Sequence, residues 1–504
     1  MLRRGLDLET GALATFGYIE PATVVPYRLS HPSPPLPPPG MIFQMAVIEQ
    51  EAPIALKSSN LRRRVFSLAW PVIAENFLET LLGIIDTWLV SQLAIGATLA
   101  LAGVGTAVQV MQFFLSALGA LSIGASVLVA QAVGAQDLAR ASNLARQSLI
   151  WSIIISIPVA LLGLVFASPM AGIFGLEPAA REIAVNYMHV TMGTVVVLIL
   201  LFIGGGVLRG AGDTRTPLIV TTIANVINVP LAWVLIYGPF GLPALGPVGS
   251  AWATFIARTI ALAILVSVLW RGRGGISIRG RGEWRPNPDL ARQVLDIGVP
   301  AALEQILVTG AFFAITIIVG QLGTTVLAAN RIAVNALSLA FLPGFGFSIA
   351  ATALVGQSIG ARNIEDGAAA TRIAARWATI WMTAFGALLF ALAPQVIGLF
   401  SNDPAVLTAG VDAMRAMALS MPGLAILFVN SGGVRGTGNT RIPLVIFGGG
   451  LWVTAGVIAL AVRAIGGGLI TVWGVFSIST PIMAWLMWRQ FRGVVARVAA
   501  EQGR

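Results

Sequence analysis

The sequence contains no cysteine and few charged residues. None of its 504 residues is Cys, and only 10% are Asp, Glu, Lys or Arg. Without cysteine there is no disulfide framework, no thiolate metal site and no cysteine nucleophile. Soluble domains carry about 25% charged residues, so the low charged fraction argues against a soluble protein. The two histidines, His31 and His189, share no motif and predict no site.

Apolar residues dominate what is present. They make up 57% of the chain, and the mean hydropathy is +0.86. Twelve apolar segments lie near 65–92, 100–132, 146–168, 183–208, 217–238, 247–270, 294–319, 326–357, 371–397, 409–433, 443–464 and 467–489. Most are long enough as helices to cross about 30 Å of hydrocarbon. Because backbone polar groups in lipid must be paired within each helix, the pattern predicts an all-α polytopic membrane protein with twelve transmembrane helices.

Two stretches of the sequence occur twice at one spacing. GGGVLRGAGDTRTPL begins at Gly204, and SGGVRGTGNTRIPL begins at Ser431. GASVLVAQAVGAQ around Gln131 and AATALVGQSIGAR around Gln357 keep the same offset of 226 residues (357 − 131). This internal repeat predicts two homologous six-helix lobes in the same orientation, related by an axis along the membrane normal.

The paired glycine-rich motifs are typical of tight turns between helices. Each follows an apolar segment and places proline in the first turn of the next helix, where proline is tolerated. The arginines are expected to anchor these turns at the lipid headgroups. The matched residues are Arg209, Gly210 and Pro217 in the first copy and Arg435, Gly436 and Pro443 in the second. Neither copy contains GxxxxGK[ST], so the motifs do not predict an ATPase.

We expect the chain to have five parts. These are a Pro-rich tail at 1–61, an N-terminal lobe at 62–270, an Arg-rich cytoplasmic linker at 271–293, a C-terminal lobe at 294–490 and a short tail at 491–504. The first part contains HPSPPLPPPG, which has no core to pack against. It is either disordered or the product of a mis-assigned start, since Met41 and Met45 offer later starts. It lacks the apolar core of about 7–15 residues that defines a signal peptide.

Arginine sets the expected orientation. Most arginines precede the first segment, follow the last or fall in the even-numbered links, whereas the odd-numbered links hold few, namely Arg181, Arg415 and Arg463. Basic loops stay on the cytoplasmic side, so both termini should be cytoplasmic. We expect the membrane to be a bacterial inner membrane. The net charge of +10 is spread over these loops, which disfavours nucleic acid as a partner.

The first apolar segment carries three acids on one face. At 100° per residue, Glu75, Glu79 and Asp86 lie within about 40° of one another. Carboxylates within a span face the bundle interior or a water-filled cavity. Asp86 follows Arg64 by 22 residues and should lie in the outer half of the span, which favours a functional role. Glu75, beside Pro71 near the cytoplasmic end, fits a structural role equally well.

The second half has fewer acids at the matching positions. At an offset of 229 residues, Glu304 matches Glu75, whereas Ile315 and Val308 stand opposite Asp86 and Glu79. This asymmetry predicts an ion-coupling site in the first half. It is centred on Asp86, with Glu304 and Glu75 as further candidates.

Other polar residues occur within the apolar segments. Arg258 and Arg331 are candidate buried partners for the acids, because an intramembrane arginine pairs with an acid or extends to the interface. Asn225, Asn228 and Asn335 are candidates for substrate contacts in a cleft or for hydrogen bonds between helices. Which acid pairs with which arginine stays open.

In this order the motifs resemble the multidrug and toxic compound extrusion (MATE) family. WPVIAEN and GIIDT in the first segment, RGAGDTRTPL, RGTGNTRIPL and LPGFGFSIAATALVGQSIGA carry the resemblance over residues 62–490. It implies a V-shaped arrangement of two six-helix lobes around a central cleft, alternating between inward-facing and outward-facing states. It also implies a secondary antiporter without a cofactor, which expels organic, cationic or amphiphilic compounds in exchange for protons or sodium.

When the sequence is compared with the family position by position, the resemblance favours protons as the coupling ion. Asp86 matches the family's aspartate in helix 1, and Asn228 matches the asparagine of helix 5. Ala232 stands where many relatives have an aspartate, and Val308 and Leu424 stand where one branch has acids. These departures disfavour that branch's sodium site. Proton coupling through Asp86 is the favoured interpretation, and sodium at a site centred on Asp86 is the alternative.

Two other functions stay open. A lipid-linked oligosaccharide flippase of the same superfamily would be expected to line its cleft with cationic residues, whereas the interior charges here are mostly acidic. A non-transporting membrane protein would not need the acids. No Ser–Lys, HExxH or paired-aspartate protease signature supports an enzyme, and no pattern predicts a metal. The expected partners of the protein, itself a monomer, are a small organic substrate, a coupling cation and the lipid bilayer.

Overall fold

The computed structural model describes residues 60–502 except 94–95 and 281–283. The described residues belong to one unit. The predicted Pro-rich tail, apart from residues 60–61, therefore lies outside the described residues.

Helices form both halves of the described chain. The first half contains α2 (Leu61–Ser91), α3 (Ala97–Gly134), α4 (Leu138–Gly172), α5 (Pro178–Gly193), α6 (Val195–Gly210), α7 (Arg215–Tyr237), η2 (Pro239–Gly241) and α8 (Val248–Arg271). The second half contains α9 (Pro288–Gly320), α10 (Thr324–Gly360), α11 (Ile364–Ala391), α12 (Ala393–Gly398), α13 (Pro404–Ala418), α14 (Met421–Gly436), α15 (Arg441–Pro443), η3 (Leu444–Gly449), α16 (Gly450–Ile465) and α17 (Leu469–Gln502). The predicted C-terminal tail thus continues α17 through Gln502.

The number of membrane-spanning elements agrees with the sequence. Among the described residues, nine helices are long and apolar enough to cross a membrane, and the total is eleven when α5–α6 and α13–α14 each count as one bent span. Together with α3, which has 38 residues, these elements fall on the twelve predicted segments. The predicted all-α membrane fold is confirmed.

Short polar signals begin several of these helices. Asp213 Oδ1 accepts a hydrogen bond from Thr216 N at 2.9 Å, and Pro217 follows in the first turn of α7. Asn287 Oδ1 accepts from Asp289 N at 3.0 Å at the start of α9. Such caps satisfy backbone N–H groups that have no partner within the helix. The repeated turn motif therefore ends α6 and starts α7 within a few residues.

The two bent spans bend at matching positions. α5 and α6 meet at 51°, and α13 and α14 meet at 46°. Thr194 and Ser420, which are 226 residues apart (420 − 194), lie at the breaks. Their hydroxyls donate to carbonyls of the preceding turn, at Val190 over 2.7 Å and at Met417 over 2.6 Å. Because such a bond bends a helix, the repeat extends from sequence to local backbone geometry.

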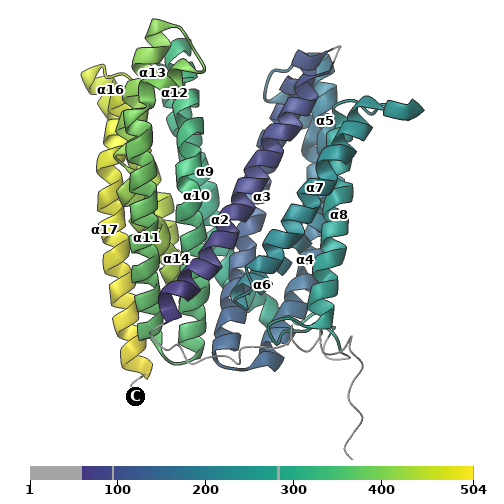
Figure 1. The fold of residues 1–504 in the computed structure, drawn as a ribbon, viewed down its shortest axis with the longest axis vertical. Coiled ribbons are helices and arrows are strands. Elements are labelled where there is room, and N and C mark those ends of the chain that lie inside the picture. The colour runs from purple at the N-terminus through teal and green to yellow at the C-terminus, as the bar shows by residue number, and fades with distance from the viewer. Residues whose placement is uncertain (1–59, 94–95, 281–283, 503–504) are drawn as a thin grey trace, which may run out of the picture. The chain divides into compact units, whose positions relative to one another are not determined.

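Each half begins with a helix that packs against the other half. Leu61, Val65 and Leu68 of α2 belong to the same core as α10, α11, α14 and α17. Ile297 of α9 belongs to the core formed by α3, α4, α6 and α8. Figure 1 shows α2 starting beside the helices of the second half and ending among those of the first, where Leu89 joins a third core. The two first helices therefore connect the halves mechanically.

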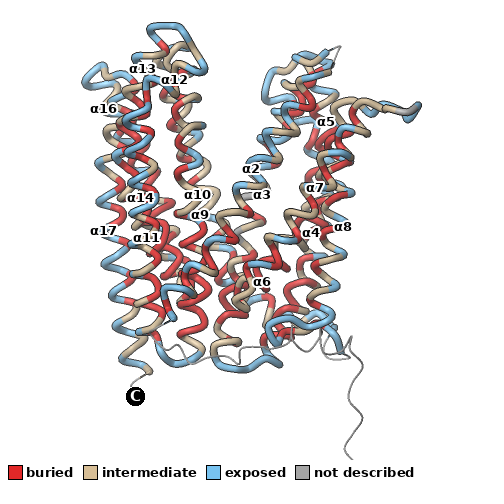
Figure 2. The backbone as a smooth tube through the Cα atoms, in the orientation of Figure 1, coloured by how far each residue is buried: buried red, intermediate tan, exposed pale blue. Residues whose placement is uncertain are grey.

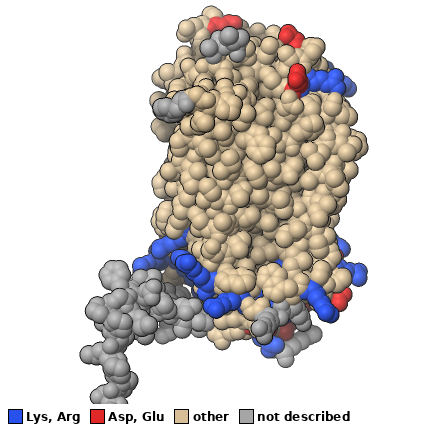
Figure 3. Space-filling model, turned by 90° about the vertical axis from the view of Figure 1, so that its right-hand side faces the viewer, with Lys and Arg blue, Asp and Glu red and all other residues tan. Residues whose placement is uncertain are grey.

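Charge distinguishes the two ends of this unit, whereas buried residues occur along its length. Figure 2 shows buried segments near α5 in the upper part of the view as well as near α6 in the lower part. On the face drawn in Figure 3, Lys and Arg gather at the lower end, and a broad band without charged side chains separates them from the opposite end. An uncharged band of this kind is suited to contact with lipid.

Candidate ion-coupling site

Two buried ion pairs join the first helix of each half to a repeated turn motif. Arg209 Nη2 donates to Glu75 Oε1 at 2.7 Å. Arg435 Nη2 donates to Glu304 Oε1 at 2.5 Å, and its Nε donates to Oε2 at 3.3 Å. Glu75 is 8% exposed and Glu304 is 2% exposed. Because either partner alone would be an uncompensated buried charge, the pairs hold the turns against α2 and α9.

These pairs differ from what the motifs predict. Arg209 and Arg435 are expected at the headgroups, but each guanidinium turns inward to a buried acid. Within the described part of the chain, the expected partners Arg258 and Arg331 form no ion pair with a carboxylate. The physical reason is that a buried carboxylate is stable only when it is paired.

The two ion pairs are not equivalent. Both carboxylate oxygens of Glu304 accept from Arg435 in a bidentate arrangement, which is the stronger geometry. Among the described residues, Glu75 Oε2 and Arg209 Nε have no hydrogen-bond partner. Thr221 Oγ1 adds only a long hydrogen bond to Glu75 Oε1, at 3.4 Å. The pair in the first half is therefore the less satisfied of the two.

Asp86 lies in a polar cluster within the first half. When the Asn228 amide is oriented to satisfy both its groups, its nitrogen donates to Asp86 Oδ1 at 3.3 Å and its oxygen accepts from Thr254 Oγ1 at 3.0 Å. Asn228 is 1% exposed. Ser250, one turn before Thr254, is also buried and lies beside Asp86. The carboxylate is thus placed between α2, α7 and α8.

Arg258 interacts electrostatically with both Asp86 and Glu79. It follows Thr254 by one turn and therefore lies on the same face of α8. Its positive charge acts on both Glu79 and Asp86. Glu79 is exposed and lies one turn from Glu75 on α2. The acids of α2 therefore form one line of charge, with a basic group from α6 at one end and another from α8 near the middle.

In the second half, α9 (Pro288–Gly320), all of which is described, has no acid at the positions that match Glu79 and Asp86. Val308 and Ile315, which stand opposite Glu79 and Asp86, are buried in an apolar core. Leu424 is buried in the same core. The two halves therefore share the Glu–Arg pair but differ at the positions of Glu79 and Asp86 on the first helix.

The other predicted polar residues have different surroundings. Asn225 Nδ2 donates to Leu78 O at 3.0 Å and so joins α7 to α2. Asn335 and Arg331 are exposed on α10. The glycines Gly210 and Gly436 end α6 and α14, and the prolines Pro217 and Pro443 are buried in the first turns that follow.

Sequence patterns miss Ser250 and Thr254. Both are small neutral residues in an apolar helix, where most hydroxyls bond to their own backbone. A usable signal is their spacing: Ser250, Thr254 and Arg258 recur at every fourth position and so form one polar face of α8. That face is directed at the helix carrying Asp86.

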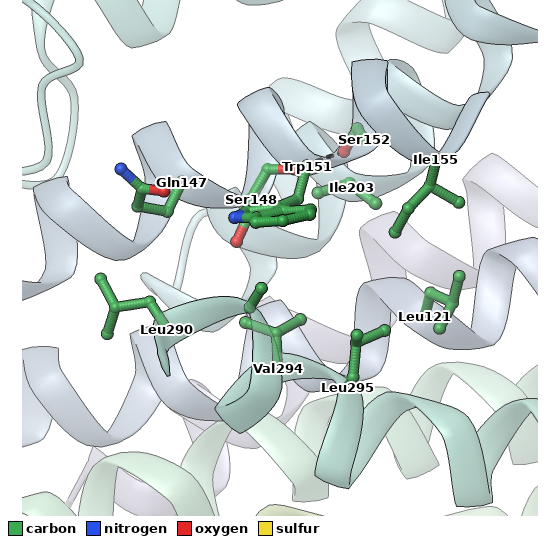
Figure 4. A pocket seen from close by; sticks show the side chains of 11 residues that line it. Leu121, Gln147, Ser148, Trp151, Ser152, Ile155, Ile203, Leu290, Val294 and Leu295 are labelled. Atoms are coloured by element: carbon green, nitrogen blue, oxygen red, sulfur yellow. Dashed lines mark hydrogen bonds between the residues drawn. The ribbon is translucent and has the colours of Figure 1, made fainter. Parts of the chain in front are cut away.

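A small cavity lies elsewhere, where α4 faces the start of α9 (Figure 4). Its volume is about 30 Å³, and Trp151 and Ser152 on one side face Leu290 and Val294 on the other. None of the acids or arginines described above lines it, so it is separate from the ion site. Among the described residues, no group of three or more His, Asp or Glu could hold a metal ion.

Apolar spanning helices around buried charges define a membrane transport protein. The MatE family model matches residues 71–234 and 300–460, one match in each half. The chain belongs to the MatE family, whose members are transporters rather than enzymes and need no cofactor.

Named relatives agree with this assignment. The chain is 30% identical over 412 residues to the "Probable multidrug resistance protein NorM" of Thermotoga maritima, covering 82% of this chain and 86% of the relative. It is 24% identical over 431 residues to the "Uncharacterized transporter YisQ" of Bacillus subtilis, covering 85% of this chain and 93% of the relative.

Solved structures share the fold. One is an outward-facing multidrug resistance MATE family transporter of the MOP superfamily, with a TM-score of 0.80 and 23% identity over 87% of this chain and 96% of that one. Another is a MOP superfamily transporter from Pyrococcus furiosus, with a TM-score of 0.79 and 23% identity over 88% of this chain and 99% of that one.

Proposed function

We propose that the protein is a secondary antiporter that exports organic, cationic or amphiphilic compounds in exchange for protons, with Asp86 as the coupling residue. Membership of the MatE family and the name of the Thermotoga relative support multidrug efflux. The observation that carries the choice of residue is the placement of Asp86 against Asn228, on a helix whose counterpart α9 has the apolar residues Val308 and Ile315 opposite Glu79 and Asp86.

The exchange requires a carboxylate with two protonation states and access to two sides. Ionised Asp86 accepts from Asn228 and attracts a cation. Protonated Asp86 has lost its charge and holds a cationic substrate less strongly. Coupling follows when proton and substrate favour different conformations. Since α2 starts in the core of the second half and ends in a core of the first, a rearrangement at Asp86 is transmitted to both.

The surroundings of Asp86 support protons over sodium. A proton needs only the carboxylate, whereas hard metal cations prefer several oxygen ligands, about six for Ca²⁺ or Mg²⁺. Val308 and Leu424 supply no ligand, because their side chains are apolar and buried.

We propose that the Arg-bearing end faces the cytoplasm of a bacterial cell and that the protein lies in the inner membrane. The gathering of Lys and Arg at one end of the face in Figure 3 supports this orientation. Both described helix ends nearest the chain termini, the start of α2 and the end of α17, lie at that end in Figure 1. Asp86 then lies toward the outer side.

Efflux of a fluorescent organic cation from proteoliposomes tests this proposal. A proton gradient and a sodium gradient are imposed separately on the parent protein and on Asp86→Asn. We expect efflux driven by protons in the parent and none in Asp86→Asn. Asp296→Asn, which changes an exposed acid at the start of α9, is the matched control and should transport like the parent.

Three results would contradict the proposal. Efflux by Asp86→Asn at the parent rate would exclude Asp86 as the coupling residue. Efflux driven only by the sodium gradient would identify sodium, instead of the proton, as the coupling ion. No efflux under either gradient, with translocation of a lipid-linked oligosaccharide instead, would identify a flippase.

A further inference from the structure

The two repeated glutamine motifs meet across the halves. Gln131 Nε2 on α3 donates to Gly436 O at 3.4 Å, and Gln357 Nε2 on α10 donates to Gly210 O at 3.0 Å. Each glutamine therefore bonds the turn of the opposite half. Gly210 and Gly436 directly follow the arginines of the two buried ion pairs, so each cross-contact ends on a turn that an ion pair fixes.

Glycines make this crossing of α3 and α10 close. A Cβ on Gly134 would overlap the backbone of Gln357, and a Cβ on Gly360 would overlap the backbone of Gln131. Ala130 is 0% exposed and packs against Gly356 of the other half. Because backbone approaches backbone here, the halves can separate at this point only when both glutamine contacts break.

The two contacts differ in strength. Arg64 Nη2 donates to Gln357 Oε1 at 2.7 Å, so the Gln357 amide uses its oxygen and its nitrogen at once. The Gln131 contact is longer, at 3.4 Å. Gln357 therefore joins α2, α6 and α10, and its loss should have the larger effect.

We propose that Gln131 and Gln357 are positioning residues for transport, which hold the Arg-bearing ends of the two halves together while the opposite end is open. They act through Gly210 and Gly436 rather than on substrate. Opening toward the Arg-bearing side then requires both hydrogen bonds to break. The adjoining ion pairs hold each turn within hydrogen-bonding distance of its glutamine. The inference rests on the proposed function for its place in a transport cycle, but the contacts themselves can be tested without transport.

Thiol labelling tests this crosswise contact. The chain has no cysteine, so Ala130→Cys introduces one thiol, which is buried unless the halves separate. A membrane-impermeant maleimide is applied to the Arg-bearing side of membrane vesicles. We expect Gln357→Ala to raise the labelling rate about three- to tenfold, as the loss of one or two ordinary hydrogen bonds predicts, and Gln131→Ala to raise it less.

The matched control is Ser348→Ala. It also removes a buried hydrogen bond made by α10, from Ser348 Oγ to Phe428 O at 2.7 Å, but within the second half. We expect its labelling rate to equal that of the Ala130→Cys parent. If Gln357→Ala does not insert, Gln131→Ala decides, because it removes a single long contact.

Two outcomes overturn the inference: labelling unchanged in both glutamine variants, or an equal increase in Ser348→Ala, which would indicate general loosening. Failure of the proposed function is a separate result. Faster labelling of the glutamine variants in a protein without proton-driven efflux would uphold the crosswise contact and reject the antiporter. Unchanged labelling, together with proton-driven efflux that depends on Asp86, would uphold the antiporter and reject the crosswise contact.

Discussion

At the scale of single residues, Glu304 and Arg435 form the most deeply buried ion pair. Glu304→Ala should lower the free energy of unfolding by about 3–5 kcal/mol, because it leaves the guanidinium buried and unpaired. The measurement is the unfolding temperature in detergent. The double variant Glu304→Ala with Arg435→Ala should lose less than the sum of the two single variants. Additive losses would show that the two side chains do not depend on each other.

A substitution in the matching pair of the first half, Glu75 and Arg209, should lower the stability of the protein less. Glu75 shares only one carboxylate oxygen with Arg209 and leaves its other oxygen without a partner among the described residues. Glu75→Gln should therefore lower the unfolding temperature less than Glu304→Gln. An equal or larger decrease for Glu75→Gln would contradict this comparison of the two pairs.

At the scale of helices, the crossing of α3 and α10 depends on glycine. Gly134→Ala should reduce the yield of folded protein, because the added methyl group would overlap the backbone of Gln357. Gly105→Ala, also in α3 but with nothing within 4 Å of the added Cβ, should be neutral or stabilising, because alanine is the better helix former. Size-exclusion chromatography in detergent compares the two. Equal yields would show that the helices are free to move apart.

Much of the helix arrangement could be predicted from the sequence. Long apolar segments predicted the spans, and the 226-residue repeat predicted two halves. The bends at Thr194 and Ser420 were not predicted, because one hydroxyl residue leaves the apolar pattern of a segment unchanged. The π-helical turn Leu444–Gly449 was not predicted, although it reads LVIFGG where the matching part of α7, a regular helix, reads LIVTTI. One extra residue per turn alters little in the apolar pattern.

The site was less predictable than the helices. One acidic face on α2 indicated Asp86 from helical spacing alone. The partner of Glu75 could not be found in that way, because Arg209 follows it by 134 residues and only the folded turn brings them together. The repeat did indicate this pairing, because Glu304 follows Glu75 and Arg435 follows Arg209 at nearly the same offset.

At the scale of the whole molecule, we propose that proton and substrate compete through Asp86. The proposed closure of the Arg-bearing end by the two glutamines accounts for one conformation of the cycle, but exchange also needs a group that responds to both ligands. Ionised Asp86 attracts a cation, and protonated Asp86 does not. Cation binding to the protonated protein should therefore displace a proton.

Substrate-induced proton release measures this competition most directly. A fluorescent organic cation is added to purified protein in weakly buffered detergent solution, and a pH indicator records the protons set free while fluorescence records binding. If the two ligands exclude each other, the parent releases about one proton per bound cation, and Asp86→Asn releases none. Equal proton release from Asp86→Asn, or cation binding by the parent without any release, would contradict proton coupling at Asp86.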